Sequence, residues 1–261
     1  MVKDRNGTVL ASAAHESEIE LYLEHVYMPG DVITVTGAKH FFARMDRMLE
    51  WGEIFASEGI MNWTVPSGEH RLAYAPGMFE TPFHIIAVRV WTKQDNVRRN
   101  LACNPADLRG DTDFFPHCNA NVETRNEACF CARNVIDGSR LNTSHGVWPY
   151  QSWGVGERTD AWCQIDLGRH ARVDAVALTL RADFPHDAFW TSGRLFFDYS
   201  WEMRIELRKT GERQLFLLPE KRWIRRIRLD SLIKSDDPSA FPALRQIEIF
   251  GEDGEKQEEL V

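Results

Sequence analysis

The sequence predicts an all-β protein made of two β-sandwich domains. Short runs of alternating apolar and polar residues recur along the 261 residues, which is the pattern of strands that bury one face. Glycine- and proline-containing turn signals separate these runs at fairly regular spacing, as in sandwiches. A polar stretch from residue 92 to 116 divides the runs into two sets. We therefore expect residues 1–95 and 117–252 to fold as separate sandwiches packed against each other.

The first set of runs begins after residues 1–17, which have the composition of a frayed start. Ile19–Glu24 alternates at period two and predicts a strand, with a helix over Ser17–Tyr27 as the alternative. Further strands are expected at 32–36, 41–46, 53–56, 60–65 and 84–91. Residues 1–95 contain no catalytic signature and resemble no family.

The second set of runs is easier to assign. Strands are expected at 202–208, 214–218, 223–229 and 246–250, with a hairpin turn at 209–212. The resulting domain map is 1–100 for the first sandwich, 101–116 for a linker, 117–252 for the second sandwich and 253–261 for a charged tail.

Four segments of the second half, in this order and spacing, resemble the discoidin or coagulation-factor type C domain. They are Asn134–Gly138, Trp162–Gly168, Val173–Arg181 and Gln246–Gly251. The resemblance implies a galactose-binding-like jelly-roll sandwich, usually non-catalytic, that binds sugars or other ligands with the loops at one end. It does not imply which ligand, because one fold hosts many functions.

Composition excludes some partners. The net charge is −8 and no long basic run is present, so nucleic acid is not an expected partner. No apolar run approaches the length that spans a membrane. The start at Met1–Gly7 lacks the apolar core of a secretory signal, and five cysteines do not form an even disulfide framework. These features favour a cytoplasmic protein, and they leave its oligomeric state open.

Aromatic residues gather in the loops of the second half. Trp148, Tyr150, Trp153 and Trp190 are candidates for a sugar-stacking platform. An aromatic ring buries the C–H face of a sugar, while fixed polar groups satisfy its hydroxyls. The alternative is that these rings close the end of the sandwich core.

Charged residues follow the predicted strand that ends near Leu180. Arg181, Asp183, His186 and Asp187 supply donors and acceptors suited to vicinal hydroxyls, and His145 adds another polar group. The alternative is an internal ion pair between Arg181 and one of the two aspartates. Both interpretations can hold together.

The resemblance also implies a structural calcium near the Asp-Gly turn. Asp137, with Thr143 or Ser144, matches the turn side of such a site. The carboxylate usually brought by the last strand is replaced by Gln246, and the lost charge weakens a site for a hard cation. No other cofactor is expected.

His117, Cys118, Cys129 and Cys131 could suggest zinc, but the C-x10-C-x-C spacing differs from paired C-x2-C knuckles. We expect reduced, metal-free thiols that act as small hydrophobes.

The sequence therefore favours a non-catalytic carbohydrate-binding protein. A sugar-processing enzyme, of the glycoside hydrolase or lyase type with its site in an interdomain cleft, is the alternative, and a protein–protein adaptor is a weaker third. No G-x-S-x-G, H-E-x-x-H or phosphate-binding loop is present.

Overall fold

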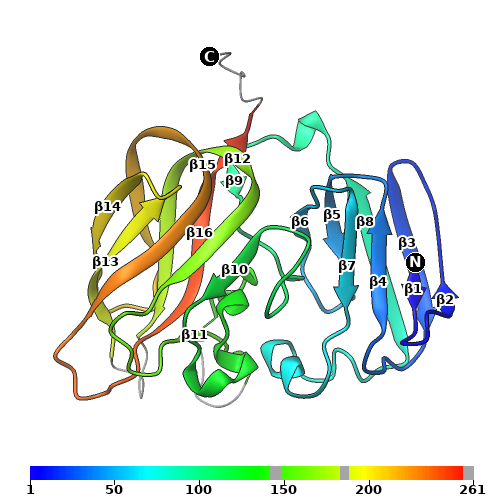
Figure 1. Cartoon of the computed structure of the whole chain (residues 1–261), viewed down its shortest axis with the longest axis horizontal. Coiled ribbons are helices and arrows are strands. Elements are labelled where there is room, and N and C mark those ends of the chain that lie inside the picture. Colours follow the sequence, from blue (N-terminus) through cyan, green and yellow to red (C-terminus); the bar gives the residue numbers. More distant parts are fainter. Residues whose placement is uncertain (142–147, 183–187, 255–261) are drawn as a thin grey trace.

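The computed structural model describes residues 1–141, 148–182 and 188–254. Figure 1 shows two β-rich halves side by side, with β1–β8 in one and β9–β16 in the other. The prediction of an all-β fold with two sandwiches is confirmed. In the described ranges no helix is long and apolar enough to cross a membrane. The helical segments are the short 3-10 turns η1 (Gly68–Ala73), η2 (Lys93–Asp95), η3 (Thr124–Asn126), η4 (Ala128–Phe130) and η5 (Ala132–Ile136).

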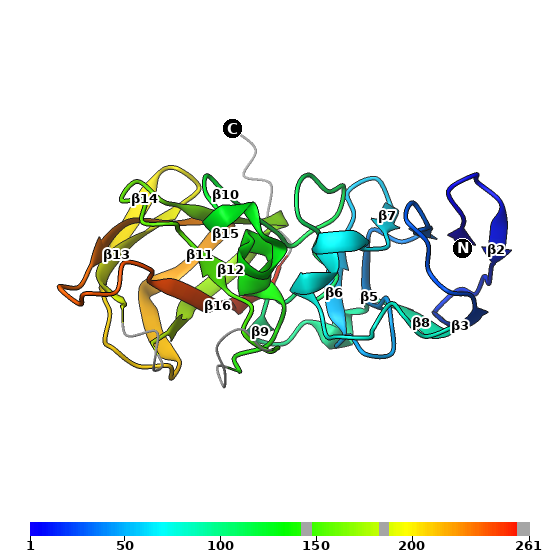
Figure 2. The ribbon, with the colours of Figure 1, turned by 90° about the horizontal axis from the view of Figure 1, so that it is seen from below.

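The first sandwich consists of two four-stranded antiparallel sheets. One has the order β2-β1-β4-β7 and the other β3-β8-β5-β6, and the view from below separates the two layers (Figure 2). The strands are β1 (Val2–Lys3), β2 (Val9–Ala11), β3 (Glu18–Glu24), β4 (Val32–Thr36), β5 (His40–Arg44), β6 (Gly52–Phe55), β7 (Ile60–Thr64) and β8 (Phe83–Val90).

Residues 19–24 form a strand, as predicted, and the helical alternative is wrong. The expectation of a frayed start is also wrong, because β1 and β2 lie within residues 1–17. Val2 is fully buried and pairs with Ile33 of β4. A strand of two residues carries too little periodicity to be recognised from sequence.

The second sandwich is built around two long strands. Its strands are β9 (Arg99–Asn100), β10 (His117–Ala120), β11 (Trp153–Gly154), β12 (Cys163–Arg181), β13 (Trp190–Phe197), β14 (Trp201–Glu206), β15 (Gln214–Lys234) and β16 (Ala243–Asp253). The first part of β12 pairs with β10 and with Arg226–Leu229 of β15. Its second part pairs with β16 and with the start of β15. Register shifts between these parts bend the strands, so that one hydrogen-bonded sheet contributes to both layers.

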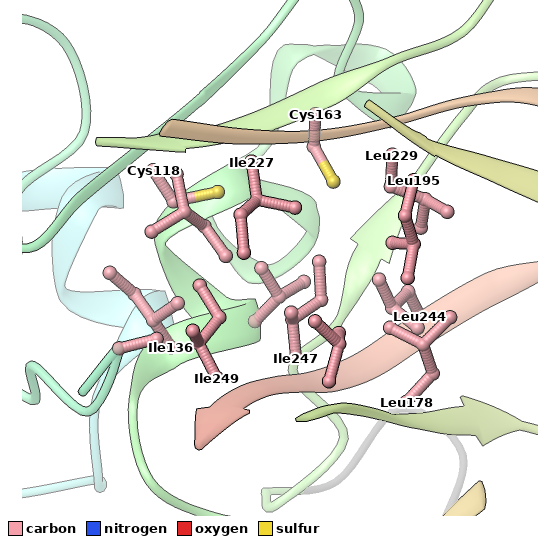
Figure 3. Close-up of a cluster of buried hydrophobic side chains, with 14 of the residues drawn as sticks. Cys118, Ile136, Cys163, Leu178, Leu195, Ile227, Leu229, Leu244, Ile247 and Ile249 are labelled. Carbon is pink, nitrogen blue, oxygen red and sulfur yellow. The ribbon is translucent and has the colours of Figure 1, made fainter. Parts of the chain in front are cut away.

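The core of the second sandwich lies between these layers. Figure 3 shows side chains from β10, β12, β13, β15 and β16 converging, including Leu178, Ile227 and Ile247 from the buried cluster. Cys118 and Cys163 point into the same core. Burial raises the pKa of the Cys118 thiol, and its hydrogen bond to Cys163 raises it further. Cys118 is therefore a protonated, inert core residue.

The segment 101–116, predicted to be a linker, runs between the sandwiches but is packed rather than exposed. Leu101 lies in the core of the second sandwich and Phe114 in the core of the first. Phe115 exchanges two backbone hydrogen bonds with Phe55 at the end of β6, at 2.7 and 2.9 Å. Its ring fills the space above Gly168, where a Cβ would come within 2.5 Å of it. Phe114 and Phe115 are adjacent aromatic residues in this otherwise polar segment, and both pack against the rest of the protein.

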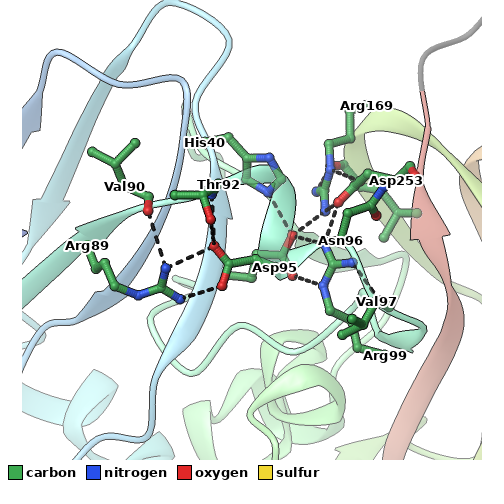
Figure 4. Close-up of polar contacts among 12 residues, drawn as sticks. His40, Arg89, Val90, Thr92, Asp95, Asn96, Val97, Arg99, Arg169 and Asp253 are labelled. Atoms are coloured by element: carbon green, nitrogen blue, oxygen red, sulfur yellow. Dashed lines mark hydrogen bonds and ion pairs between the residues drawn. The ribbon is translucent and has the colours of Figure 1, made fainter. Parts of the chain in front are cut away.

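A buried ionic cluster joins the two halves (Figure 4). Glu53 of β6 is buried and accepts hydrogen bonds from His40, Arg99 and Arg169. The last two arginines also bind Asp253 at the end of β16. Burial acts to raise the pKa of Glu53, but hydrogen bonds from His40 and Arg99 and the charge of Arg169 outweigh it and lower the pKa to about 2. The carboxylate is therefore ionised throughout the neutral and mildly acidic range.

This cluster predicts acid sensitivity. Because the pKa of Glu53 is lowered on folding from 4.5 to about 2, its stabilisation is complete above pH 4.5 and is lost as the pH falls toward 2. We expect Glu53→Gln to reduce the free energy of unfolding by about 3 kcal/mol at pH 7. The difference from the wild type should vanish in acid, as measured by denaturant unfolding across this range. Glu212→Gln, at an exposed turn, is the control, and an equal loss at all pH values would contradict the assignment.

Candidate ligand-binding site

A pocket with a cavity volume of about 660 Å³ opens at one end of the second sandwich. Its walls come from η3 and η4, from the segment around β11, from the end of β12 and from the residues that lead into β16. It is lined by Thr124, Arg125, Glu127, Cys129, Phe130, Tyr150, Ser152, Gly154, Gly156, Glu157, Arg181, Phe241, Pro242 and Ala243.

Three aromatic rings form the apolar part of the pocket. Phe130 and Tyr150 meet edge to face, with ring centroids 6.2 Å apart. Phe241, from the opposite wall, is largely exposed. Arg125 covers the ring of Phe130 at 5.2 Å and is itself held by Glu127. The pocket therefore presents ring surfaces of different orientation to a small ligand.

Polar groups lie between these rings. Burial raises the pKa of Tyr150 to about 12, and a hydrogen bond with Cys129 contributes in the same direction. The tyrosine therefore stays a neutral donor. The side chain of Ser152 is fully buried, and its Oγ has no hydrogen-bond partner among the described residues. A buried hydroxyl without a hydrogen-bond partner lowers the stability of the fold unless a ligand or a water molecule bonds to it.

Arg181 is buried at the end of β12, where it lines the pocket. Its guanidinium donates to the carbonyl of Tyr150 at 2.6 Å. This bond fixes the backbone of the segment that carries Tyr150 and Ser152. Arg181 and Tyr150, both predicted from the sequence as ligand-binding residues, line the same cavity.

Trp153 and Trp190 do not offer a stacking surface. They are 0% and 2% exposed, lie in the core of the second sandwich, and contact each other with ring centroids 6.1 Å apart. Trp153 also donates its indole N–H to the carbonyl of Val122 at 2.8 Å. The alternative considered from the sequence, that these rings close the sandwich core, describes both of them.

The remaining predicted residues have different outcomes. Trp148 is 41% exposed, but it is not among the described residues that line the pocket. His145, Asp183, His186 and Asp187 lie outside the described residues, as does Thr143.

Sequence reasoning missed Phe130, Ser152 and Phe241. Phe130 stands in the cysteine-containing segment, which looked like an entry into the domain rather than part of a site. Phe241 precedes Pro242 just before the last strand. An aromatic residue in a proline-containing loop is the sequence feature that could have identified it as a candidate pocket residue.

The predicted calcium position is already occupied by an arginine side chain. Arg245 is the extra residue of a bulge in β16, because Gln246 and Leu244 pair with consecutive residues of β12. Its buried guanidinium binds both carboxylate oxygens of Asp137 at 3.1–3.2 Å and the carbonyl of Asn134 at 3.0 Å. Gln246 Nε2 donates to Asp137 as well, at 3.1 Å. Asp137 and Gln246 therefore do not fit a calcium cage, because the cation would face the guanidinium charge.

The residues considered for zinc do not converge either. Cys118 lies in the core of the second sandwich, Cys131 in that of the first, and Cys129 at the pocket. His117 binds Asp107 at 2.7 Å. Among the described residues, the group that could hold a metal is His40, Glu53 and Asp253, but Arg99 and Arg169 occupy its carboxylates.

No protein-family model matches the sequence, and no curated protein matches it. The solved structures that resemble the chain include carbohydrate-binding modules. A Streptococcus pneumoniae fucose binding module has a TM-score of 0.42 and 17% identity, covering 62% of this chain and 100% of the module.

Two further structures resemble the chain to a similar degree. Chitosan-binding module 1 of a Paenibacillus sp. IK-5 chitosanase/glucanase, in a point-mutant form, has a TM-score of 0.41 and 17% identity, covering 59% of this chain and 100% of the module. A family 32 CBM from C. perfringens NanJ, solved with galactose, has a TM-score of 0.39 and 16% identity, covering 51% of this chain and 91% of the module. At these identities and TM-scores the comparisons assign neither a ligand nor a binding residue to this chain.

The arginine in the bulge of β16 predicts calcium-independent stability. Adding EDTA or calcium should leave the melting temperature unchanged. Arg245→Met should lower the free energy of unfolding by about 3 kcal/mol, because it leaves Asp137 without its cation. Thermal unfolding with and without EDTA measures both effects, and a melting temperature that falls on chelation would contradict this assignment.

The burial of Trp190 predicts a structural role. We expect Trp190→Ala to destabilise the protein by about 3–5 kcal/mol, as for other large-to-small core changes. Trp148→Ala, at an exposed ring, should have little effect on stability. Denaturant unfolding distinguishes the two, and an unchanged midpoint for Trp190→Ala would refute the core assignment.

Proposed function

We propose that this protein binds carbohydrate without transforming it, in the pocket between η4 and the start of β16. The observation that carries the proposal is the combination of exposed ring surface with a buried, unpartnered Ser152 hydroxyl in one cavity of the described structure. Sugars need both, because their C–H faces are apolar and their rims carry hydroxyl groups. The volume of about 660 Å³ falls in the range of small-molecule sites.

The charged groups of the pocket support binding over hydrolysis. A glycosidase needs one carboxyl group that is protonated at working pH and a second that faces it. The pocket contains Glu127 and Glu157. The hydrogen bond from Arg125 lowers the pKa of Glu127, so this group is a fixed anion rather than a general acid.

One cavity between the sandwiches offers little to an enzyme. It measures about 240 Å³, and its described lining includes Arg109 and Arg133 but no aspartate or glutamate. A pair of catalytic carboxylates is therefore not available within that lining. Larger cavities between the two halves do include carboxylates, among them Glu50, Asp137 and Asp253, so the preference for the pocket rests on its rings and on Ser152.

Within this proposal, Tyr150 and Phe241 provide the ring surfaces and Ser152 the buried hydroxyl contact. Arg181 positions the backbone of Tyr150 and lines the cavity beside it. Asp183, His186 and Asp187, which follow Arg181 in the sequence, remain predictions, as does His145.

The proposal predicts separate effects on binding and stability. A glycan array that includes galactose, fucose and chitosan oligosaccharides identifies the ligand, and calorimetry then measures its affinity. Tyr150→Ala and Phe241→Ala should each weaken binding by about fivefold or more, since a stacked ring contributes about 1 kcal/mol beyond its buried area. Ser152→Ala should weaken binding about threefold to tenfold without lowering the melting temperature, because its hydroxyl has no described protein partner.

Tyr199→Ala is the matched control, since Tyr199 is an exposed ring outside the pocket lining. Failure of every glycan to bind, or unchanged affinity in all three pocket variants, would remove the basis for this site. Release of a cleaved product during calorimetry would instead favour the enzymatic alternative.

A further inference from the structure

The outer face of the β3-β8-β5-β6 sheet meets the second sandwich at Glu53 of β6, and farther from that edge it carries a groove of about 790 Å³. Side chains alternate across each strand, so the residues that flank buried Leu23 and Ile86 point outward. The groove is lined by His15, Glu18, Ile19, Glu20, Phe42, Trp51, Ala87, Val88 and Arg89.

A small residue creates the hollow. Ala87 of β8 lies between Glu20 of β3 and Arg44 of β5 in register. The small side chain of Ala87 forms the floor of the groove, and the longer side chains of Glu20 and Arg44 form its walls. Glu20 and Arg44 approach to only 3.8 Å across this position, and the Glu20 side chain is 76% exposed.

Aromatic rings follow the groove and continue beyond it. Trp51 is 41% exposed, with the Arg44 guanidinium over one face of its ring at 5.2 Å. Phe42 lines the groove beside it and lies under Arg89 at 4.4 Å. On the same face, Tyr22 and Phe83 stack with centroids 6.5 Å apart and are 57% and 59% exposed. From Phe83 to Arg89 the face extends about 20 Å at the rise of a β-strand. Apolar ring surface of this extent and exposure suits an elongated ligand.

The charged residues around the groove indicate which kind of elongated ligand it would bind. Glu18, Glu20 and Glu24 project from alternate positions of β3, and all three are exposed. Arg89, the arginine of the lining, is neutralised by a bidentate pair with Asp95 (Figure 4). Among the described residues of this face, Glu18, Glu20, Glu24 and Asp95 outnumber Arg44 and Arg89. The net charge beside the rings is therefore negative, which favours a ligand that carries positive charge.

We infer that this face is a second binding site, for an oligosaccharide whose rings carry protonated amines. The ring faces of Trp51 and the Tyr22–Phe83 pair bury the C–H faces of successive sugars, and Glu18 and Glu20 bind their ammonium groups. A basic peptide shares the charge but lacks flat C–H faces at regular spacing. The inference is independent of the pocket in the second sandwich.

The test is calorimetry at about pH 6 with an oligosaccharide of glucosamine. The fully N-acetylated oligosaccharide of the same length and an oligolysine of equal charge are the comparison probes. We expect the glucosamine oligosaccharide to bind at least about tenfold more tightly than either. Trp51→Ala should weaken its binding about fivefold or more, and Glu20→Gln about threefold or more.

A matched variant serves as the control. Glu58→Gln, an exposed glutamate of the same sandwich outside the groove, should leave binding unchanged. Equal binding of the N-acetylated probe or of oligolysine would overturn the assigned ligand class. Unaltered affinity in Trp51→Ala, with circular dichroism showing an intact fold, would overturn the site.

Discussion

The buried carboxylate of Glu53 is the interaction on which the arrangement of the two sandwiches depends. Removing a carboxylate from water is expensive, and it is tolerated only where charge and hydrogen bonds replace hydration. Here His40 comes from the first sandwich, whereas Arg99 and Arg169 come from the second. Because Asp253 neutralises the second arginine charge, the cluster holds β6, β9, β12 and β16 together. The packed segment around Phe114 and Phe115 adds apolar contacts to the same junction.

Buried arginines that bind backbone carbonyls recur elsewhere in the molecule. Arg133 donates to the carbonyls of Ala73 and Pro105 and lies over the ring of Tyr74 at 4.5 Å. Arg181 also binds a backbone carbonyl beside the candidate pocket, and Arg245 binds one at the Asp137 turn. In each case a planar fork of donors connects segments that have no sheet hydrogen bonds to each other. The loops at this end therefore take their shape from arginines in the sandwiches as well as from their own sequences.

The sequence could predict the strands but only part of the site. Alternation identified the strands at 19–24 and 202–208 because each buries one face. Arg181 and Tyr150 were recognised because they lie at strand ends and in loops. Trp153 and Trp190 could not be told from ligand-binding rings, since sequence does not reveal which side of a loop faces the core. Ser152 gave no signal, because its importance comes from burial without a described partner. The bulge that turns Arg245 toward Asp137 is likewise a property of pairing register.

The arginine that binds Asp137 has a consequence for how this loop behaves over time. A turn organised by a bound ion exists as filled and empty populations, whose ratio follows the concentration of that ion. Arg245 is covalently attached to β16, so the positive charge that binds Asp137 does not depend on the concentration of a free ion. The shape of the turn at Asp137 is consequently not expected to follow the concentration of divalent ions. Because Arg245 is part of the chain, binding and release of an ion are not expected to switch the conformation of this turn.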